Sequence, residues 1–133
     1  MVDAPSTGRE AIRTRQLVQL RALLRTVRPD NSFYEKKLGA ADIDETIDSL
    51  EEFSARCPFT TKDELAADQQ ANAPYGTNLT FPLEQYNRIH QTSGTSGKPL
   101  RWLDTPESWQ SMLESWKLVY RTAGVTATDR ALF

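Results

Sequence analysis

Glycine, hydroxyl and lysine residues are concentrated in one stretch of the sequence, HQTSGTSGKPL, which runs from His90 to Leu100. Gly94 and Gly97 let the backbone adopt conformations closed to residues with a Cβ, so several N–H groups can converge on one anion. Lys98 adds a mobile positive charge at the far end of the stretch. Hydroxyl donors stand at Ser93, Thr95 and Ser96. This combination of donors is typical of a loop that binds phosphate.

The nucleotide-binding loop G-x-x-x-x-G-K-S/T does not fit these residues. Its spacing requires a glycine at position 92 and a hydroxyl residue at position 99, where the sequence has Thr92 and Pro99. That motif also opens a helix, whereas the residues after Pro99 have the pattern of a strand. The sequence therefore excludes this loop on both spacing and context.

Two short strands are predicted on either side of the glycine-rich loop, at 86–91 and 100–103. Thr105 and Pro106 then begin a helix, with a hydroxyl cap followed by proline in the first turn, and Gly124 ends it. We expect Trp109 and Trp116, seven residues apart on the apolar face of this helix, to lie in the core. That face carries Trp109, Met112, Leu113, Trp116, Val119, Tyr120 and Ala123.

Helices are also predicted for the part of the chain that precedes the strands. A long helix spans 7–27, where apolar residues recur at helical spacing, and Pro29 ends the pattern. A short helix follows, with Asn31 or Ser32 as its cap and Gly39 as its terminator. A third short helix is expected at 45–53.

The predicted elements give an α/β (mixed) fold class. A fourth helix should begin at Thr60 or Thr61, because Thr61 and Glu64 have the spacing of a capping box. We expect a single incomplete domain over residues 1–133. Its parts are a helical portion at 1–70, an irregular loop at 71–85, and at 86–133 a strand, the phosphate-binding loop, a strand, a long amphipathic helix and the start of a strand.

Composition and charge favour a small-molecule partner in the cytoplasm. The 133 residues include 16 Lys and Arg against 18 Asp and Glu, and this net charge of -2 argues against nucleic acid or an anionic membrane as the main partner. No apolar run is long enough to span a bilayer, and the N-terminus lacks the apolar stretch of a secretory signal. The single cysteine, Cys57, cannot form an internal disulfide and is interpreted as an inert thiol.

The stretch from Thr92 to Pro99 resembles the signature loop of the adenylate-forming (acyl-CoA synthetase-like, AMP-binding) ligase superfamily, S/T-S-G-S/T-S/T-G-x-P, at every position. Many members carry a lysine after the proline, where this sequence has Leu100. In the phenylacetate-CoA ligase branch the lysine commonly precedes the proline, as Lys98 does. Other segments resemble that branch in the same order along the chain: SFYEKKL, PFTTKDEL, NAPYG and RIHQTSGTSGKP.

This resemblance implies that the chain is the N-terminal part of the large domain of an ATP-dependent carboxylate-CoA ligase. Such an enzyme activates an aryl or related carboxylic acid as an acyl-adenylate and transfers the acyl group to coenzyme A. The loop would grip the phosphates of ATP while Mg²⁺ shares their charge. The residues that the resemblance assigns to this role are Thr92, Ser93, Gly94, Thr95, Ser96, Gly97 and Lys98. No catalytic residue and no metal ligand is expected within these 133 residues, so the chain alone should be inactive.

Other interpretations of the sequence stay open. The chain can be a phosphate- or nucleotide-binding module without catalysis, or a helical interaction protein that acts through its amphipathic helices. Within the enzyme class, another carboxylate-activating relative, such as a capsular polysaccharide biosynthesis protein, fits as well. Strands that lack further partners leave a homodimer open. His90 is interpreted as a hydrogen-bonded structural residue, outside any catalytic group.

Overall fold

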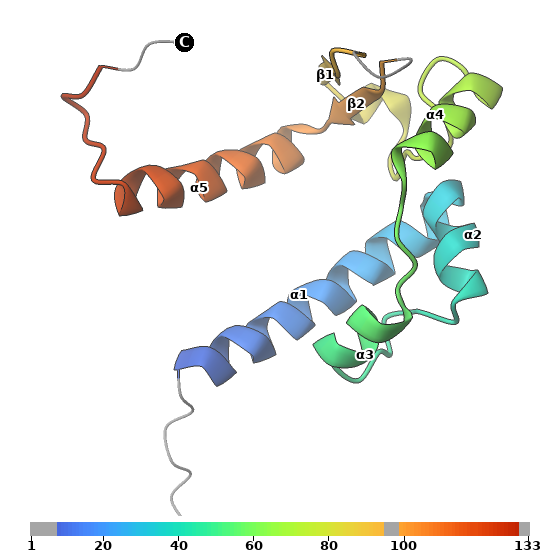
Figure 1. Ribbon diagram of the computed structural model, residues 1–133, viewed down its shortest axis with the longest axis horizontal. Coiled ribbons are helices and arrows are strands. Elements are labelled where there is room, and N and C mark those ends of the chain that lie inside the picture. Colours follow the sequence, from blue (N-terminus) through green and yellow to red (C-terminus); the bar gives the residue numbers. More distant parts are fainter. Residues whose placement is uncertain (1–7, 95–98, 131–133) are drawn as a thin grey trace, which may run out of the picture.

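The computed structural model describes residues 8–94 and 99–130 (Figure 1). Helices come first along the chain, followed by an antiparallel hairpin and a long last helix, so the mixed α/β class predicted from the sequence is confirmed. Among the described residues, none of the helices combines the length and the apolar character needed to cross a bilayer.

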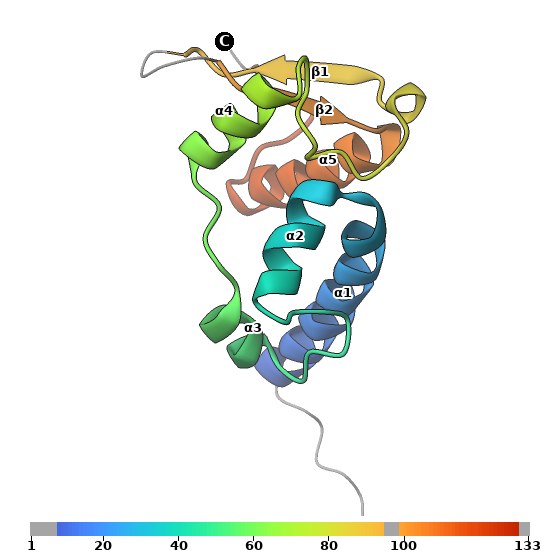
Figure 2. The same ribbon diagram turned by 90° about the vertical axis from the view of Figure 1, so that its right-hand side faces the viewer.

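The first part of the described chain is helical, with α1 (Gly8–Asp30), α2 (Ser32–Ala40), α3 (Leu50–Arg56) and α4 (Lys62–Ala71). α2 lies alongside α1, and α3 lies beside the N-terminal half of α1 (Figures 1 and 2). A small apolar core forms around Leu24, Leu38, Ile43 and Ile47. Burial of such a side chain stabilises a fold by about 1.5–3 kcal/mol, and this cluster holds α1 and α2 together.

The ends of α1 and α2 differ from the prediction. α1 runs through Pro29, because the proline lies in the last turn and removes only one hydrogen bond there, while the Asn31 N–H still donates to the Val27 carbonyl at 3.0 Å. α2 continues past Gly39, and the residue that takes the left-handed conformation is Asp42, with φ 52°. The next residue, Ile43, is then directed into the core.

α3 begins at Leu50, so the prediction of a helix at 45–53 is wrong at its start. The Asp44 carboxylate accepts a hydrogen bond from the Thr46 N–H at 2.7 Å, which holds these residues in a turn. Ser49 then caps the helix by accepting from the Glu52 N–H at 3.0 Å. The side chain of Asp44 therefore competes with helix formation over the first residues of the predicted range.

α4 begins where the capping-box spacing predicts. The Thr61 hydroxyl accepts from the Glu64 N–H, and the Glu64 carboxylate accepts from the Thr61 N–H at 2.7 Å. The chain after α4 is irregular up to the first strand, as predicted, apart from one 3-10 turn, η1 (Leu83–Gln85).

The hairpin consists of β1 (Arg88–Gln91) and β2 (Arg101–Asp104), which pair antiparallel with Arg88 opposite Asp104 and Gln91 opposite Arg101. The strands predicted at 86–91 and 100–103 are thus confirmed with slightly displaced ends. The hairpin lies beside α4, at the opposite end of the molecule from α3 (Figures 1 and 2). α4 is therefore the helix that can support the base of the glycine-rich loop.

α5 (Pro106–Thr122) begins and ends as predicted, with the Thr105 hydroxyl accepting from the Ser108 N–H at 3.2 Å and Gly124 following the helix at φ 76°. The expectation that Trp109 and Trp116 lie in the core is wrong. Trp116 is 50% exposed and Trp109 is only half-buried. Leu113, Val119 and Tyr120 are exposed as well. The helix contacts β2 at its start and then extends away from the other described elements (Figure 1), which leave its later turns uncovered.

Residues 125–130 form a turn in which the Thr126 N–H donates to the Asp129 carboxylate at 2.6 Å. None of these residues begins a strand. The rest of the strand start predicted for this end of the chain falls on 131–133, which lie outside the described residues.

Candidate functional site

The base of the glycine-rich loop is closed by hydrogen bonds between the residues that flank it. The Thr92 N–H donates to the Leu100 carbonyl at 3.0 Å, and the Leu100 N–H donates to the Thr92 hydroxyl at 2.9 Å. Leu100 is only 4% exposed and anchors the exit of the loop. Gly94 has φ 68°, a left-handed conformation that a residue with a Cβ adopts only with strain.

Some of the predicted phosphate-binding residues fall within the described chain, namely Thr92, Ser93 and Gly94. The others, Thr95, Ser96, Gly97 and Lys98, lie outside the described residues. Gly94 adopts a positive φ, as expected from the conformational freedom of glycine at this position of the loop. Thr92 has a further role that the sequence reasoning missed, because its hydroxyl accepts the Leu100 N–H. The pairing of the two strands could have indicated this contact, because their register places Thr92 opposite Leu100, one residue beyond the last pair, Gln91 and Arg101.

Gln69 of α4 binds β2 at the exit of the loop. Its Nε2 donates to the Arg101 carbonyl at 2.7 Å, and its Oε1 accepts from the Arg101 N–H at 3.0 Å. A cavity of about 270 Å³ lies here between α4 and the hairpin, with Gln70 and Gln91 also in its wall. The sequence reasoning missed Gln69, since nothing in the local pattern of α4 indicates a partner 32 residues away.

His90 joins the hairpin to the start of α5. Its ring stacks on Trp109, with the centroids 5.1 Å apart and the planes inclined by 11°. Its Nε2 lies 3.4 Å from the Asp104 carboxylate on the paired strand. The Arg88 guanidinium lies 4.6 Å from the centroid of the same indole. These contacts agree with the interpretation of His90 as a structural residue.

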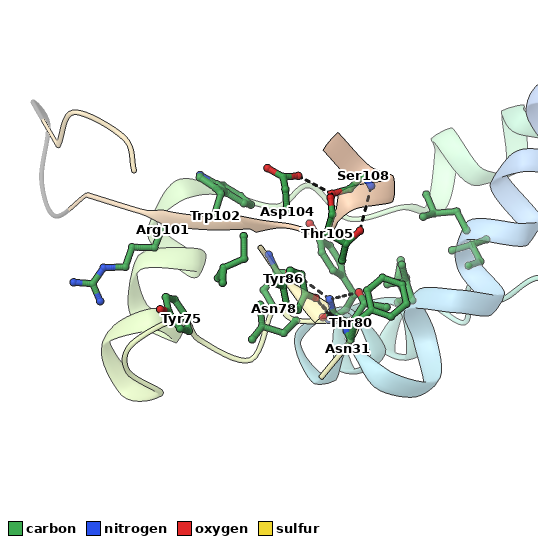
Figure 3. A pocket seen from close by; sticks show the side chains of 18 of the residues that line it. Asn31, Tyr75, Asn78, Thr80, Tyr86, Arg101, Trp102, Asp104, Thr105 and Ser108 are labelled. Atoms are coloured by element: carbon green, nitrogen blue, oxygen red, sulfur yellow. Dashed lines mark hydrogen bonds between the residues drawn. The ribbon is translucent and has the colours of Figure 1, made fainter. Parts of the chain in front are cut away.

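A larger cavity, of about 430 Å³, lies between α1, α2 and the connection from β2 to α5 (Figure 3). Much of its wall is apolar and includes Leu20, Leu24, Val27, Leu79, Phe81 and Leu103. Asn31 is 2% exposed, and its side-chain Nδ2 donates to the side-chain Oδ1 of Asn78 at 3.2 Å and to the Thr80 hydroxyl at 3.1 Å. The Tyr86 hydroxyl in turn accepts from the Thr80 N–H at 3.0 Å. These four polar side chains of the wall, Asn31, Asn78, Thr80 and Tyr86, thus belong to one hydrogen-bonded network, and much of the remaining wall offers apolar contact.

Shifted pKa values in the helical part fit structural roles. Burial raises the pKa of the Cys57 thiol, which keeps it protonated and agrees with its interpretation as inert. The Lys37 ammonium, 2.6 Å from Glu64, lowers the pKa of that carboxyl to about 2, with a contribution from Thr61. Among the described residues, no group of three or more His, Cys, Asp or Glu side chains is placed to hold a metal ion.

Comparison with known proteins identifies relatives among CoA ligases. No family model matches the chain. A phenylacetate-coenzyme A ligase of Thermus thermophilus is 35% identical over 92 residues, which make up 68% of this chain and 19% of that protein.

Solved structures of a 2-hydroxyisobutyryl-CoA ligase have the same fold over most of this chain. One, in complex with 2-HIB-AMP and CoA in the thioesterification state, aligns with a TM-score of 0.72 and 26% identity over 83% of this chain and 23% of that chain. Another, an open conformation with the same two ligands, aligns with a TM-score of 0.71 and 24% identity over 83% of this chain and 25% of that chain. The chain therefore spans about a fifth to a quarter of the length of these relatives.

Proposed function

The chain belongs to the adenylate-forming CoA ligase superfamily, and on that premise we propose that it serves the ATP-dependent activation of a carboxylic acid. The acid, an aryl or related carboxylate, attacks the α-phosphate of ATP to give an acyl-adenylate and pyrophosphate. The thiol of CoA then displaces AMP and forms the thioester. Because the chain spans 19% of the Thermus ligase, we assign to it only the phosphate-binding part of this reaction. The need for ATP and CoA favours the cytoplasm.

The observation that carries the proposal is the closed hairpin base at Thr92 and Leu100, which presents a loop of the superfamily's residue order. The side chains assigned to the β- and γ-phosphates of ATP are those of Ser93, Thr95, Ser96 and Lys98. Glycine at positions 94 and 97 allows backbone conformations in which several N–H groups can converge on the same oxygens. Removal of one such donor costs about 2.7–4 kcal/mol in comparable oxyanion sites.

Mg²⁺ fits this loop as a partner of the bound phosphates. Residues 92–99 contain hydroxyl oxygens and no carboxylate, and Mg²⁺ usually combines one or two protein ligands with substrate phosphates and water. When bound, the ion shares the negative charge of the phosphates. The N–H groups, hydroxyls and lysine of the loop bind and orient the phosphate oxygens themselves.

Calorimetric titration of the chain with ATP tests the phosphate-binding part. We expect saturable binding of ATP that is lost in the double variant Ser96→Ala and Lys98→Ala, and no binding of adenosine. Binding that survives the double substitution would show that the loop does not hold the nucleotide. Pyrophosphate release with ATP, CoA and a panel of aryl carboxylates tests the assignment of the remaining steps. We expect no turnover by the chain alone, and turnover would place the whole reaction in these residues.

The exposed apolar face of α5 supports a second role, contact with further polypeptide. This face includes Trp116, Val119 and Tyr120, and the relatives are several times longer than the chain. We propose that it packs against ligase regions that the chain does not span. A homodimer through the same face is the competing occupant. Sedimentation of the wild type and of Trp116→Glu at several concentrations distinguishes the two, since only a homodimer gives association that depends on concentration and is abolished by the variant.

A further inference from the structure

The backbone groups of Arg101 that bind Gln69 point away from β1. Thr92 and Leu100 exchange the closing hydrogen bonds of the hairpin, so the neighbouring pair, Gln91 opposite Arg101, directs its N–H and C=O groups outward. Outward groups of an edge strand normally bind water or another chain. The Gln69 amide occupies both of them at once, as a neighbouring strand would.

The turn that follows α4 holds the side chain of Arg101. Asp68 accepts from the Thr77 N–H at 2.7 Å and from the Thr77 hydroxyl at 2.8 Å, and these bonds close the turn. Within it, the Pro74 carbonyl accepts from the Arg101 guanidinium at 3.2 Å. Arg101 is therefore bound through its backbone by α4 and through its side chain by the turn.

We propose that Gln69 is a positioning residue for the phosphate-binding loop, because it fixes Arg101 and so sets the place where the chain leaves the loop. The inference rests on the proposed phosphate-binding role of that loop. Leu100, the residue before Arg101, is held by burial of its side chain and by Thr92, so Gln69 completes the anchoring of the exit. A loop whose ends are fixed before the ligand arrives loses less conformational entropy on binding. Gln69 therefore raises the affinity for phosphate without touching it.

The test compares Gln69→Met with Gln70→Met. Methionine keeps the length and the helix propensity of glutamine and removes the amide, and Gln70 is the exposed neighbour on the same helix. Tripolyphosphate, titrated calorimetrically into the whole chain, probes the loop. The chemical shift of the Arg101 amide proton reports on the hydrogen bond to Gln69. We expect Gln69→Met to bind tripolyphosphate roughly threefold to tenfold more weakly and to move the Arg101 amide upfield, whereas Gln70→Met changes neither.

The outcomes of this comparison distinguish failure of the inference about Gln69 from failure of the proposed phosphate-binding function. Equal affinities of the wild type and both variants overturn the inference and leave the proposed function standing. Equal losses in both variants also overturn it, since they reflect a general effect on α4. Absence of tripolyphosphate binding by the wild type overturns the phosphate-binding role, and the inference with it. If Gln69→Met does not fold, Gln69→Glu replaces it, since that carboxylate keeps the acceptor and loses the donor.

Discussion

Substitution of Thr92 by valine tests the hydrogen bond that closes the glycine-rich loop. The variant removes the hydroxyl that accepts the Leu100 N–H at 2.9 Å and keeps the shape of the side chain. Leu100 is 4% exposed, so water has little access to the N–H that loses its partner. A buried donor left unsatisfied costs about 1–3 kcal/mol. Valine recovers about 0.5 kcal/mol through its preference for strands. We therefore expect a net loss of about 0.5–2.5 kcal/mol in the free energy of unfolding.

Urea unfolding followed by circular dichroism measures this loss. A small protein has a slope of about 1–3 kcal/mol per molar urea, so at an intermediate slope of about 2 the midpoint should fall by about 0.25–1.25 M. Thr92→Ser is the matched control, because serine keeps the hydroxyl and loses only the methyl group. We expect its midpoint to lie close to that of the wild type. If Thr92→Val and Thr92→Ser unfold at the same urea concentration, the hydroxyl does not close the loop and the reasoning is refuted.

Three further substitutions test other contacts. Asn31→Ala should lower the free energy of unfolding by about 2–4 kcal/mol in urea, because Asn31 caps α2 through the Tyr34 N–H and binds Asn78 and Thr80. The exposed control Asn87→Ala should cost less than about 0.5 kcal/mol. Equal losses in the two variants would show that the hydrogen bonds of Asn31 are dispensable. Gly76→Ala should lower the Tm, because Gly76 has a φ of 81° and the new Cβ would collide with the Asp68 carboxylate; the backbone strain alone costs about 1–2 kcal/mol. Gly8→Ala is the control, since a Cβ at Gly8 meets open space. An unchanged Tm in both variants would contradict the expected strain at Gly76. Lys37 and Thr61 lower the pKa of Glu64 from 4.5 to about 2, so its ionised form stabilises the fold above pH 4.5 and this contribution is lost as the pH falls toward 2. The Tm of Glu64→Gln should fall less steeply than that of the wild type across this range, and parallel curves would exclude the effect.

Helix starts were predictable because each cap and its partner lie within one turn of the chain. Asn31, Thr61 and Thr105 all cap helices where the sequence places them. The start of α3 was missed, although its cause is also local: the carboxylate of Asp44 holds a turn that the apolar periodicity did not reveal. The ends of α1 and α2 were missed because Pro29 and Gly39 are tolerated inside the last turn of a helix.

The family was predictable from residue order. Thr92 to Pro99 matches the superfamily's loop at every position, and the relatives confirm that assignment. Phosphate binding by the loop stays a prediction, as does the division of the chain into one incomplete domain. Amphipathic spacing identified α5 and its apolar face, but it did not reveal that the face is exposed, because periodicity shows which side chains share a face and says nothing about what covers them.

The sequence by itself thus determined the short-range features of this protein: the helix caps, the hairpin and the composition of the loop between its strands. Only the tertiary structure decided that the Gln69 amide binds Arg101, that the Thr92 hydroxyl is engaged by Leu100, and that α5 is left uncovered by the described elements. The physical reason is the separation along the sequence between the groups that interact. A cap or turn joins groups a few residues apart, whose pairing the spacing encodes, whereas a contact between α4 and β2 depends on how every intervening element folds.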